Sequence, residues 1–384
     1  MNFIQAKAFE EKYELMKRLS SQFSTRAHQV DVEGGFPFEN IDDLKKSGYT
    51  SLTVPKKYGG QEISLFELLR LQEKIAEGDG ATALSIGWHM GIIKNLAEKE
   101  VWSEAVFKKM CEAIMNGALI NAAATEANTG SPTRGGKPET TAEEKGNHWV
   151  INGRKTFTTM SPVLDYFIVS ATIKDENKVG NFLVPRSTTG VLIEETWDSI
   201  ALRGTGSHDL LLHNVIVPIE NLVETIGNDG KKPNGWLLHI PACYLGIAKA
   251  AKTQAIEFAS TYSPNSIGGA IIDLPNVRQK IGEIELSLMQ AESFLYSVAN
   301  QWDQSEVHSR EGMAPILGAV KLSVTNTAVS VVDLAMRIVG ARSLSLKNPL
   351  QRYYRDVRAG LHNPPMDDMT IQMLANHAIH SHQK

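Results

Sequence analysis

The spacing of apolar residues changes twice along this chain of 384 residues, and these two changes limit its possible folds more than any other feature. Up to about residue 117 apolar residues recur every three or four positions, which is typical of helices. From about 118 to 218 they form short runs rich in β-branched and aromatic residues, which predicts strands. Helical spacing then returns and continues to the end of the sequence. This order predicts an α+β protein.

We therefore expect three domains: a helical domain over 1–117, an antiparallel β domain over 118–222 and a helical bundle over 223–384. In the first domain, Gly78-Asp79-Gly80 is expected to separate two helices. The second of these is apolar on nearly every face, so it is predicted to be a buried central helix. In the β domain, Asn152-Gly153 between two β-rich runs predicts a tight hairpin, because both residues tolerate positive φ.

Charge and composition are those of an ordinary soluble protein. Lysine and arginine number 39 and the acidic residues 43, which gives a formal net charge of −4 and indicates neither a nucleic-acid surface nor a polybasic membrane anchor. No window approaches the ~20 apolar residues of a membrane span, and the N-terminus lacks the features of a signal peptide. A cytoplasmic location is expected. Cys111 and Cys243 are predicted to be buried thiols, and no spacing of Cys or His predicts a metal site.

Three motifs in and beside the predicted strands carry hydroxyl groups and glycines. They are "NAAATEANTGSPTRGG" (121–136), "NGRKTFTTMSP" (152–162) and "ALRGTGSHDLLLHNVIVP" (201–218). Phe157 and Thr159 are two residues apart on a predicted strand and should point to the same side. Each motif alone is more typical of a turn or a half-buried strand than of a site. No phosphate-binding loop or dinucleotide-binding glycine motif is present.

These motifs, taken in their joint order, resemble the acyl-CoA dehydrogenase family of flavoproteins. The order is T-E-x-x-x-G-S, then N-G-x-K-x-x-x-T, then L-R-G-T-G-S-H-D followed by a strand ending V-x-V-P. The resemblance extends from 54–64 to "RDVRA" at 355–359. It implies an N-terminal helical domain, a middle β-barrel and a C-terminal four-helix bundle. It also implies FAD between the β domain and the bundle, a homotetramer that shares its cofactor sites, and a role in fatty acid metabolism.

The resemblance assigns cofactor contacts residue by residue. The expected contacts are Ala122, Ala124, Thr125, Gly130 and Ser131 along the flavin and its linker, Phe157 on the ring and Thr159 near its reactive nitrogen. At the distal end Gly340 is kept, but Arg337 replaces a glutamine of the family and Ala341 replaces a glycine. A phosphate-binding arginine segment is also absent, with "NSIGG" (265–269) in its place. FAD is the expected cofactor and FMN the alternative.

The substrate side departs from the family. When Arg355-Asp356 is aligned with the family's R-D pair, the catalytic glutamate falls at Pro364, which has neither a carboxylate nor an N–H. Some members place the glutamate on an earlier helix, and that position is about Trp236 here, with Leu237 where a substrate-side arginine would be.

Three hypotheses follow, of which we favour the first on sequence alone. An acyl-CoA dehydrogenase could use Asp367 or Asp368 as its base and pass electrons to an electron-transfer partner. A protein similar to the flavin-dependent monooxygenases of the superfamily would use O2, reduced flavin from a reductase, and His362. A third kind of protein would bind flavin or an acyl ligand without turnover.

Simpler roles compete with these. His362 could be a helix C-terminal residue favoured by the helix dipole, and Asp367-Asp368 the acidic start of the last helix. His89, on the apolar helix, is predicted to be a core or pocket-wall residue. His208 and His213 flank a strand with no evident partner.

Overall fold

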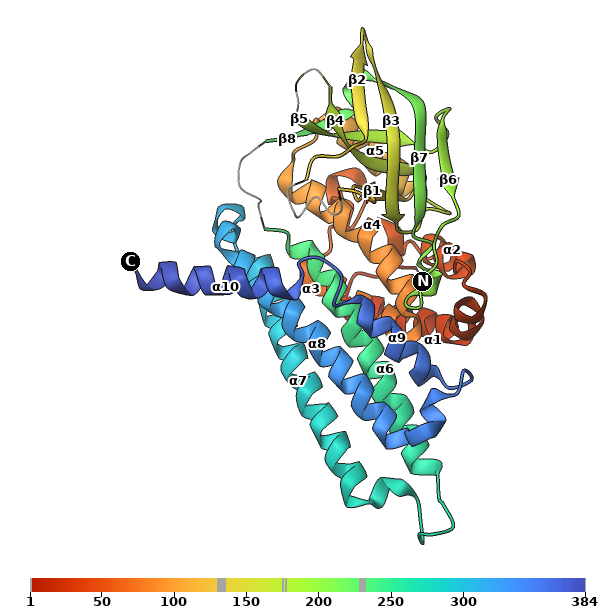
Figure 1. Ribbon diagram of the computed structural model, residues 1–384. Helices are drawn as coiled ribbons and strands as arrows, with labels where there is room; N and C mark the ends of the chain where they lie inside the picture. Colours follow the sequence, from red (N-terminus) through yellow and green to blue (C-terminus); the bar gives the residue numbers. More distant parts are fainter. Residues whose placement is uncertain (1, 130–135, 175, 177, 228–232, 384) are drawn as a thin grey trace.

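The chain folds into a helical body with a β domain at one end, as Figure 1 shows. The computed structural model describes residues 2–129, 136–174, 176, 178–227 and 233–383. The helices are α1 (Phe9–Glu33), α2 (Phe38–Lys46), α3 (Leu65–Gly78), α4 (Gly80–Lys99), α5 (Glu104–Met115), α6 (His239–Thr261), α7 (Pro275–Gln304), α8 (Ala314–Val339), α9 (Pro349–Ala359) and α10 (Asp367–His382). The strands are β1 (Ile120–Ala123), β2 (Thr141–Lys145), β3 (His148–Thr158), β4 (Tyr166–Ile173), β5 (Lys178–Pro185), β6 (Val191–Glu194), β7 (His208–Pro218) and β8 (Leu222–Ile226). The predicted α+β class and the order of helices, strands and helices are confirmed.

The strands form one mixed sheet. Their order is β6-β7-β3-β2-β4-β5-β8, with β1 paired to β4. Most neighbours are antiparallel, as expected, but β1 and β2 both run parallel to β4. Strand β1, the first strand after the N-terminal helices, therefore pairs with β4 in the interior of the sheet.

The hairpin predicted at Asn152-Gly153 was wrong. Strand β3 continues through both residues, and its register against β7 shifts between Ile151 and Gly153. Asn152 exchanges hydrogen bonds with Asn214 on β7, at 2.7 and 3.1 Å, so the asparagine stabilises an irregular pairing. The tight turn lies earlier, between β2 and β3, where Gly146 has a φ of 68°.

The break predicted at Gly78-Asp79-Gly80 is confirmed. Helix α3 ends at Gly78, and the Asp79 carboxylate accepts the backbone N–H of Thr82 at 3.0 Å, which caps the start of α4. Most residues of α4 are buried, as its sequence predicted. Such a helix can position side chains against both the bundle and the β domain.

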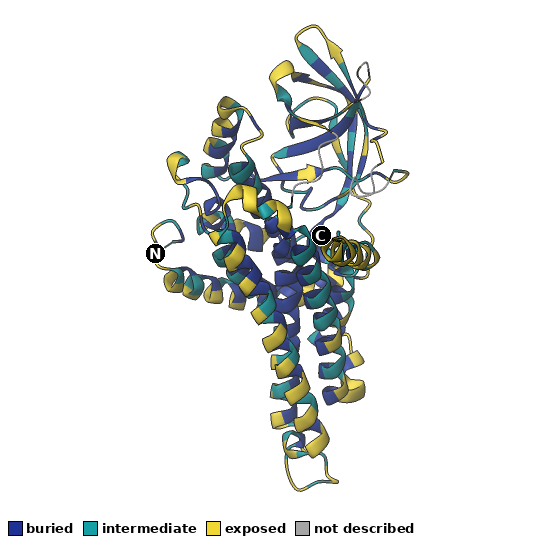
Figure 2. Ribbon diagram, turned by 90° about the vertical axis from the view of Figure 1, so that its left-hand side faces the viewer, coloured by how far each residue is buried: buried dark blue, intermediate teal, exposed yellow. Residues whose placement is uncertain are grey.

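The long helices α6, α7 and α8 pack side by side, and α3 and α9 also contact α6. Among the described helices, α8 with its flanking turns is long and apolar enough to cross a membrane, but half of its apolar window is buried inside the fold. Helix α10 differs from the others, because only Thr370 on it is buried. Figure 2 shows that α10 is exposed along most of its length.

Candidate functional site

The structure brings the three sequence motifs together at one edge of the β domain. Thr159, just after β3, lies with its hydroxyl 3.0 Å from that of Ser207, and Ser207 is 2.9 Å from the hydroxyl of Thr205. Asn121 on β1 donates its amide to the Thr159 carbonyl at 2.9 Å. We call the edge formed by Ala122, Ala124, Thr125, Phe157, Thr159 and Ser207 the β-domain rim.

Phe157 lies on this rim with 63% of its surface exposed. Its φ is 56°, and Thr159 N–H donates to its carbonyl at 2.9 Å, so the chain turns here. The expectation that Phe157 and Thr159 share one face of a strand was therefore wrong, because β3 ends at Thr158. Both residues still belong to the rim. The Phe157 ring meets Trp197 edge to face, with centroids 6.1 Å apart.

Below the rim lies a buried ion pair, Glu126 with Lys155, at 2.6 Å. Glu126 also accepts the backbone N–H groups of Glu139 at 2.6 Å and Thr140 at 3.0 Å. Burial alone would raise the pKa of Glu126, but the bonds from Lys155, Thr140 and Glu139 outweigh it and hold the pKa at about 2. Burial lowers the pKa of the Lys155 ammonium. The pair fixes the segment that follows Thr125 against β3.

The rim fits a flat ring with one apolar face and a polar edge. Phe157 offers an exposed aromatic surface, Ala122 is exposed, and Ala124 and Thr125 are partly exposed. The hydroxyls of Thr159 and Ser207 provide hydrogen-bonding atoms on the same edge. A flavin has this shape and chemistry, so the described residues fit the flavin that the sequence predicts. Gly130 and Ser131 lie outside the described residues.

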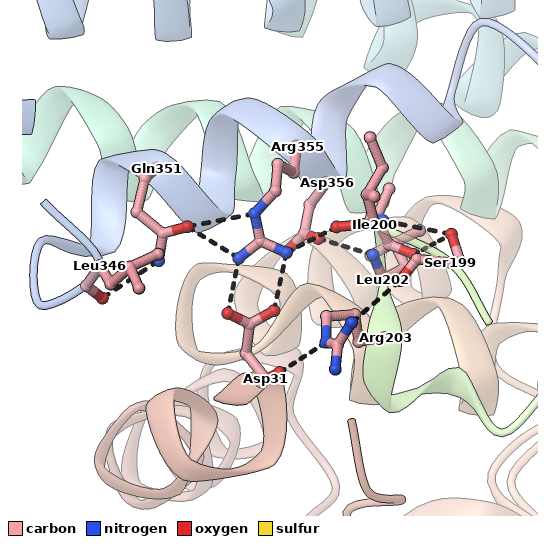
Figure 3. A network of polar contacts seen from close by, with 10 residues as sticks. Asp31, Ser199, Ile200, Leu202, Arg203, Leu346, Gln351, Arg355 and Asp356 are labelled. Atoms are coloured by element: carbon pink, nitrogen blue, oxygen red, sulfur yellow. Dashed lines mark hydrogen bonds and ion pairs between the residues drawn. The ribbon is translucent and has the colours of Figure 1, made fainter. Parts of the chain in front are cut away.

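The Arg355-Asp356 pair, which set the sequence alignment, joins three parts of the fold. Figure 3 shows Arg355 bonded to both carboxylate oxygens of Asp31 on α1, at 3.0 and 2.6 Å, and to the Ile200 carbonyl. Asp356 accepts the Leu202 N–H at 2.6 Å. Burial raises the pKa of Asp356 to about 7, although the Leu202 bond lowers it. These contacts hold α9 against α1 and the loop before β7.

The segment after α9 carries the predicted catalytic residues. His362 is exposed, and no hydrogen bond or ion pair of its side chain is seen among the described residues. The next residue, Asn363, accepts the Tyr244 hydroxyl at 2.5 Å, which ties this segment to α6.

The two aspartates begin α10 on the side of α8. Asp367 is 3.5 Å from the ammonium of buried Lys321 and accepts the Asn326 amide at 2.8 Å. Asp368 is exposed and accepts the N–H of the following residue, Met369, at 2.8 Å. Both carboxylates therefore stabilise the start of α10, and the Asp367 oxygens are both engaged.

The predicted distal cofactor residues lie apart from the rim. Arg337 is exposed and paired with Asp333 one turn earlier, at 2.7 Å. Gly340 ends α8 with a φ of 69° and open space around it. Figure 1 places this end of α8 at the end of the bundle far from the β domain. Among the described residues, one chain does not bring Arg337 and Gly340 together with the rim.

Among the histidines, His89 is a core residue, as predicted. Its Nδ1 accepts the Ile120 N–H at 3.1 Å, so its Nε2 donates to the Thr50 carbonyl at 2.9 Å. Burial lowers its pKa to about 4. The expectation that His208 lacks a partner was wrong, because its Nδ1 accepts the Trp197 N–H at 3.0 Å. Sequence reasoning missed Trp197, which lies in a loop with no motif.

Comparison with known proteins gives a consistent result over most of the chain. Residues 14–118 match the acyl-CoA dehydrogenase N-terminal domain, 121–215 its middle domain and 238–363 a C-terminal domain of the same family. The chain belongs to the acyl-CoA dehydrogenase family. It is therefore an oxidoreductase of the flavoprotein type.

Individual relatives show how wide this family is. The chain is 53% identical, over 99% of both sequences, to YdbM of Bacillus subtilis (strain 168), whose own acyl-CoA dehydrogenase assignment is provisional. Its fold is similar to that of the dibenzothiophene monooxygenase TdsC of Paenibacillus sp. A11-2 in a complex with FMN and indole (TM-score 0.86, 22% identity, 94% and 95% of the chains covered). It is equally similar to butyryl-CoA dehydrogenase of Megasphaera elsdenii (TM-score 0.85, 20% identity, 99% and 100% covered). At these identities the two structures establish the fold.

Proposed function

We propose that this flavoprotein is a monooxygenase, which transfers one oxygen atom from O2 to a small substrate and takes its electrons from reduced flavin. The observation that carries the proposal is the position of Asp367. Its two oxygens bind Lys321 and Asn326 on α8, so it is held as a structural residue rather than as a free base. Dehydrogenation of a thioester needs a carboxylate that can reach the α-proton.

The other positions for such a base support the same proposal. The family's usual position is Pro364 and the earlier one is Trp236, and neither residue carries a carboxylate. Asp368 is exposed at the start of an exposed helix. Dehydrogenation by Asp367 or Asp368, the hypothesis favoured from sequence, is therefore the alternative that the experiment below must distinguish from oxygenation.

The chain's own residues have defined parts in the proposal. Bound reduced flavin would supply two electrons, which with O2 and two protons give an oxygenated product and water. Phe157 would cover the flavin ring, and the hydroxyls of Thr159 and Ser207 would hold its polar edge. His362, an exposed imidazole on the segment after α9, would hold or donate a proton.

We also propose that the cofactor is FAD and that the working unit is a homotetramer. Arg337 and Gly340 lie far from the rim within one chain, so a cofactor that contacts both sets of residues would bridge two copies. Exposed Ile371 and Ile379 on α10 offer apolar surface for such a copy. Light scattering of the flavin-loaded protein would give the mass of the assembly, and a mass other than that of four chains would contradict this part.

The proposal is tested with flavin-loaded protein under two conditions. With a flavin reductase, NADH and O2, we expect a product heavier by one oxygen atom from at least one of indole, benzothiophene and quinoline. Without O2, we expect butyryl-CoA and longer acyl-CoAs to leave the flavin oxidised. Bleaching of the flavin by an acyl-CoA, with no oxygenated product, would establish dehydrogenation instead.

Two variants separate the roles of the acidic residues and the histidine. His362→Asn should slow oxygenation about a hundredfold if it handles a proton. The matched control is His377→Asn, since His377 is an exposed histidine on α10. Asp367→Asn together with Asp368→Asn should leave oxygenation unchanged, and a loss of acyl-CoA bleaching in this double variant would identify a base.

A further inference from the structure

Three aromatic side chains form a compact cluster where α4 meets the start of α6. Trp88 on α4 meets Trp236 and His239 edge to face, with centroids 5.7 and 5.0 Å apart. Trp236 and His239 are stacked, with an angle of 6° between their planes and 5.8 Å between centroids. We call Trp88, Trp236 and His239 the aromatic box. His239 is fully buried, whereas both tryptophans are partly exposed.

Two glycines on α4 make room for the box. A Cβ at Gly87 would lie 2.4 Å from His239 Nδ1, and a Cβ at Gly91 would lie 2.4 Å from Trp236 Cε3. The two glycines are one helical turn apart, so they lie on the same face of α4. The rings therefore pack directly on bare backbone, which fixes their positions.

Several polar atoms of this cluster have no hydrogen-bond partner among the described residues. They are both ring nitrogens of His239 and the indole nitrogen of Trp236. The Gln72 side-chain oxygen is also unpaired, and the Gln72 amide lies against the same Gly87 position as His239. Buried polar atoms in folded proteins are normally paired, so such a group points to a ligand or to ordered water.

The box lies on the side of α4 that also contacts β1, since Trp236 packs against the apolar cluster that contains Ile120. His89, next to Trp88 on α4, binds the N–H of Ile120, and β1 then leads to the rim residue Ala122. Trp236 is the position at which some members of the family carry their base. A ligand in the box would therefore lie near the position that the family resemblance gives to a base.

We propose that the aromatic box binds the substrate, and that this substrate is a small, uncharged heteroaromatic molecule that stacks on the tryptophans and hydrogen-bonds to His239. This inference rests on the proposed oxygenation and names its substrate class. For a ligand to reach the buried imidazole, the Trp236 indole that is stacked on it has to move aside.

The electrostatics of the box favour an uncharged ligand. Burial lowers the pKa of His239 to about 3, so the imidazole is neutral, with one donor and one acceptor nitrogen. Trp88, Trp236 and Gln72 carry no charge either. An ionised substrate group would lose its hydration here without gaining a counter-charge from these four side chains, whereas a ring nitrogen or N–H would pair with His239.

The test measures binding of indole, benzothiophene and quinoline to the oxidised, flavin-loaded protein by calorimetry, which requires no turnover. We expect at least one probe to bind. His239→Leu should weaken that binding about tenfold, because one hydrogen bond is lost. Its Tm without probe should be no lower than that of the wild type, because two unpaired polar atoms are removed. His239→Gln keeps a donor and an acceptor and should recover part of the affinity.

The matched control is His89→Leu, the same substitution at a buried histidine whose nitrogens are both paired. It should lower the Tm and leave probe affinity unchanged at a temperature where the variant is folded. The inference is wrong if no probe binds, if His239→Leu binds as tightly as the wild type, or if it loses as much Tm as His89→Leu. Binding without oxygenation would contradict the proposed function alone. Oxygenation of a probe that binds independently of His239 would contradict the box alone.

Discussion

Replacing Lys155 by methionine should weaken the β domain and its hold on flavin together. The Lys155 ammonium lies 2.6 Å from the Glu126 carboxylate, and the two residues are 0% and 3% exposed. Removing one partner of a buried ion pair leaves the other charge uncompensated, at a cost of about 3–5 kcal/mol. Backbone bonds from Glu139 and Thr140 remain, so we expect about 3 kcal/mol.

The pKa of Glu126 gives an upper bound for this magnitude, because it reflects the bonds from Thr140 and Glu139 as well as the bond from Lys155. The pKa of Glu126 falls from 4.5 to about 2 on folding, which corresponds to about 3 kcal/mol at neutral pH. Because the folded pKa is lowered, this stabilisation is fully present above pH 4.5 and is lost as the pH falls through 2. The difference between the wild type and Lys155→Met should therefore be largest above pH 4.5 and should shrink in acid.

The assay is thermal unfolding of both proteins from pH 3 to pH 7, read by circular dichroism, with flavin retention measured on the same samples. We expect flavin affinity to fall, since Glu126 follows the rim residue Thr125 directly. The double variant Lys155→Met with Glu126→Gln should be more stable than Lys155→Met alone, because no charge is left buried. Equal stability of Lys155→Met and the wild type at pH 7, or a difference that grows in acid, would refute the reasoning.

Three further predictions concern other parts of the site. Burial raises the pKa of Asp356 to about 7. The stability that Asp356 contributes is therefore present below its ordinary pKa of 3.8 and is lost as the pH rises through 7. Between pH 5 and pH 8, the Tm of Asp356→Asn relative to that of the wild type should rise. Arg337→Ala, a change at an exposed residue, should weaken binding of FAD but not of FMN, and equal losses would exclude a distal contact. Tyr244→Phe removes the hydrogen bond to Asn363 and should lower the free energy of unfolding by about 1 kcal/mol. It should also slow oxygenation, because the segment that carries His362 loses its bond to α6. An unchanged rate in a folded variant would exclude this role.

The parts of the fold that were predictable depend on local rules. The break at Asp79 follows from its capping of α4, and the order of helices and strands follows from apolar spacing. The errors came from contacts distant in sequence. Asn152-Gly153 would suit a hairpin turn, but the pairing of Asn152 with Asn214 on β7 holds it inside a continuous strand. No local rule indicates such a partner.

The same distinction applies to the site. The closeness of the rim residues could be expected, because they occur in motifs whose joint order resembles that of the family. The aromatic box could not, since Gly87, Trp88 and His239 come from two helices separated by the whole β domain. Two glycines one turn apart in an apolar helix were the available signal, and they indicate a close approach without naming the ring that makes it.

The contacts of Arg355 and Asp356 explain how the family's R-D pair can be kept where the usual position of its base is a proline. Both residues bind parts of this chain, namely Asp31 on α1 and the backbone at Ile200 and Leu202. They are needed to assemble the fold whichever substrate is used. The base position, nine residues after Arg355, is on a segment held by the separate Tyr244–Asn363 bond, so proline at 364 leaves that bond and the Arg355 contacts in place. The residues that hold the fold together here are thus physically separate from position 364, and a change at that position leaves the fold contacts intact.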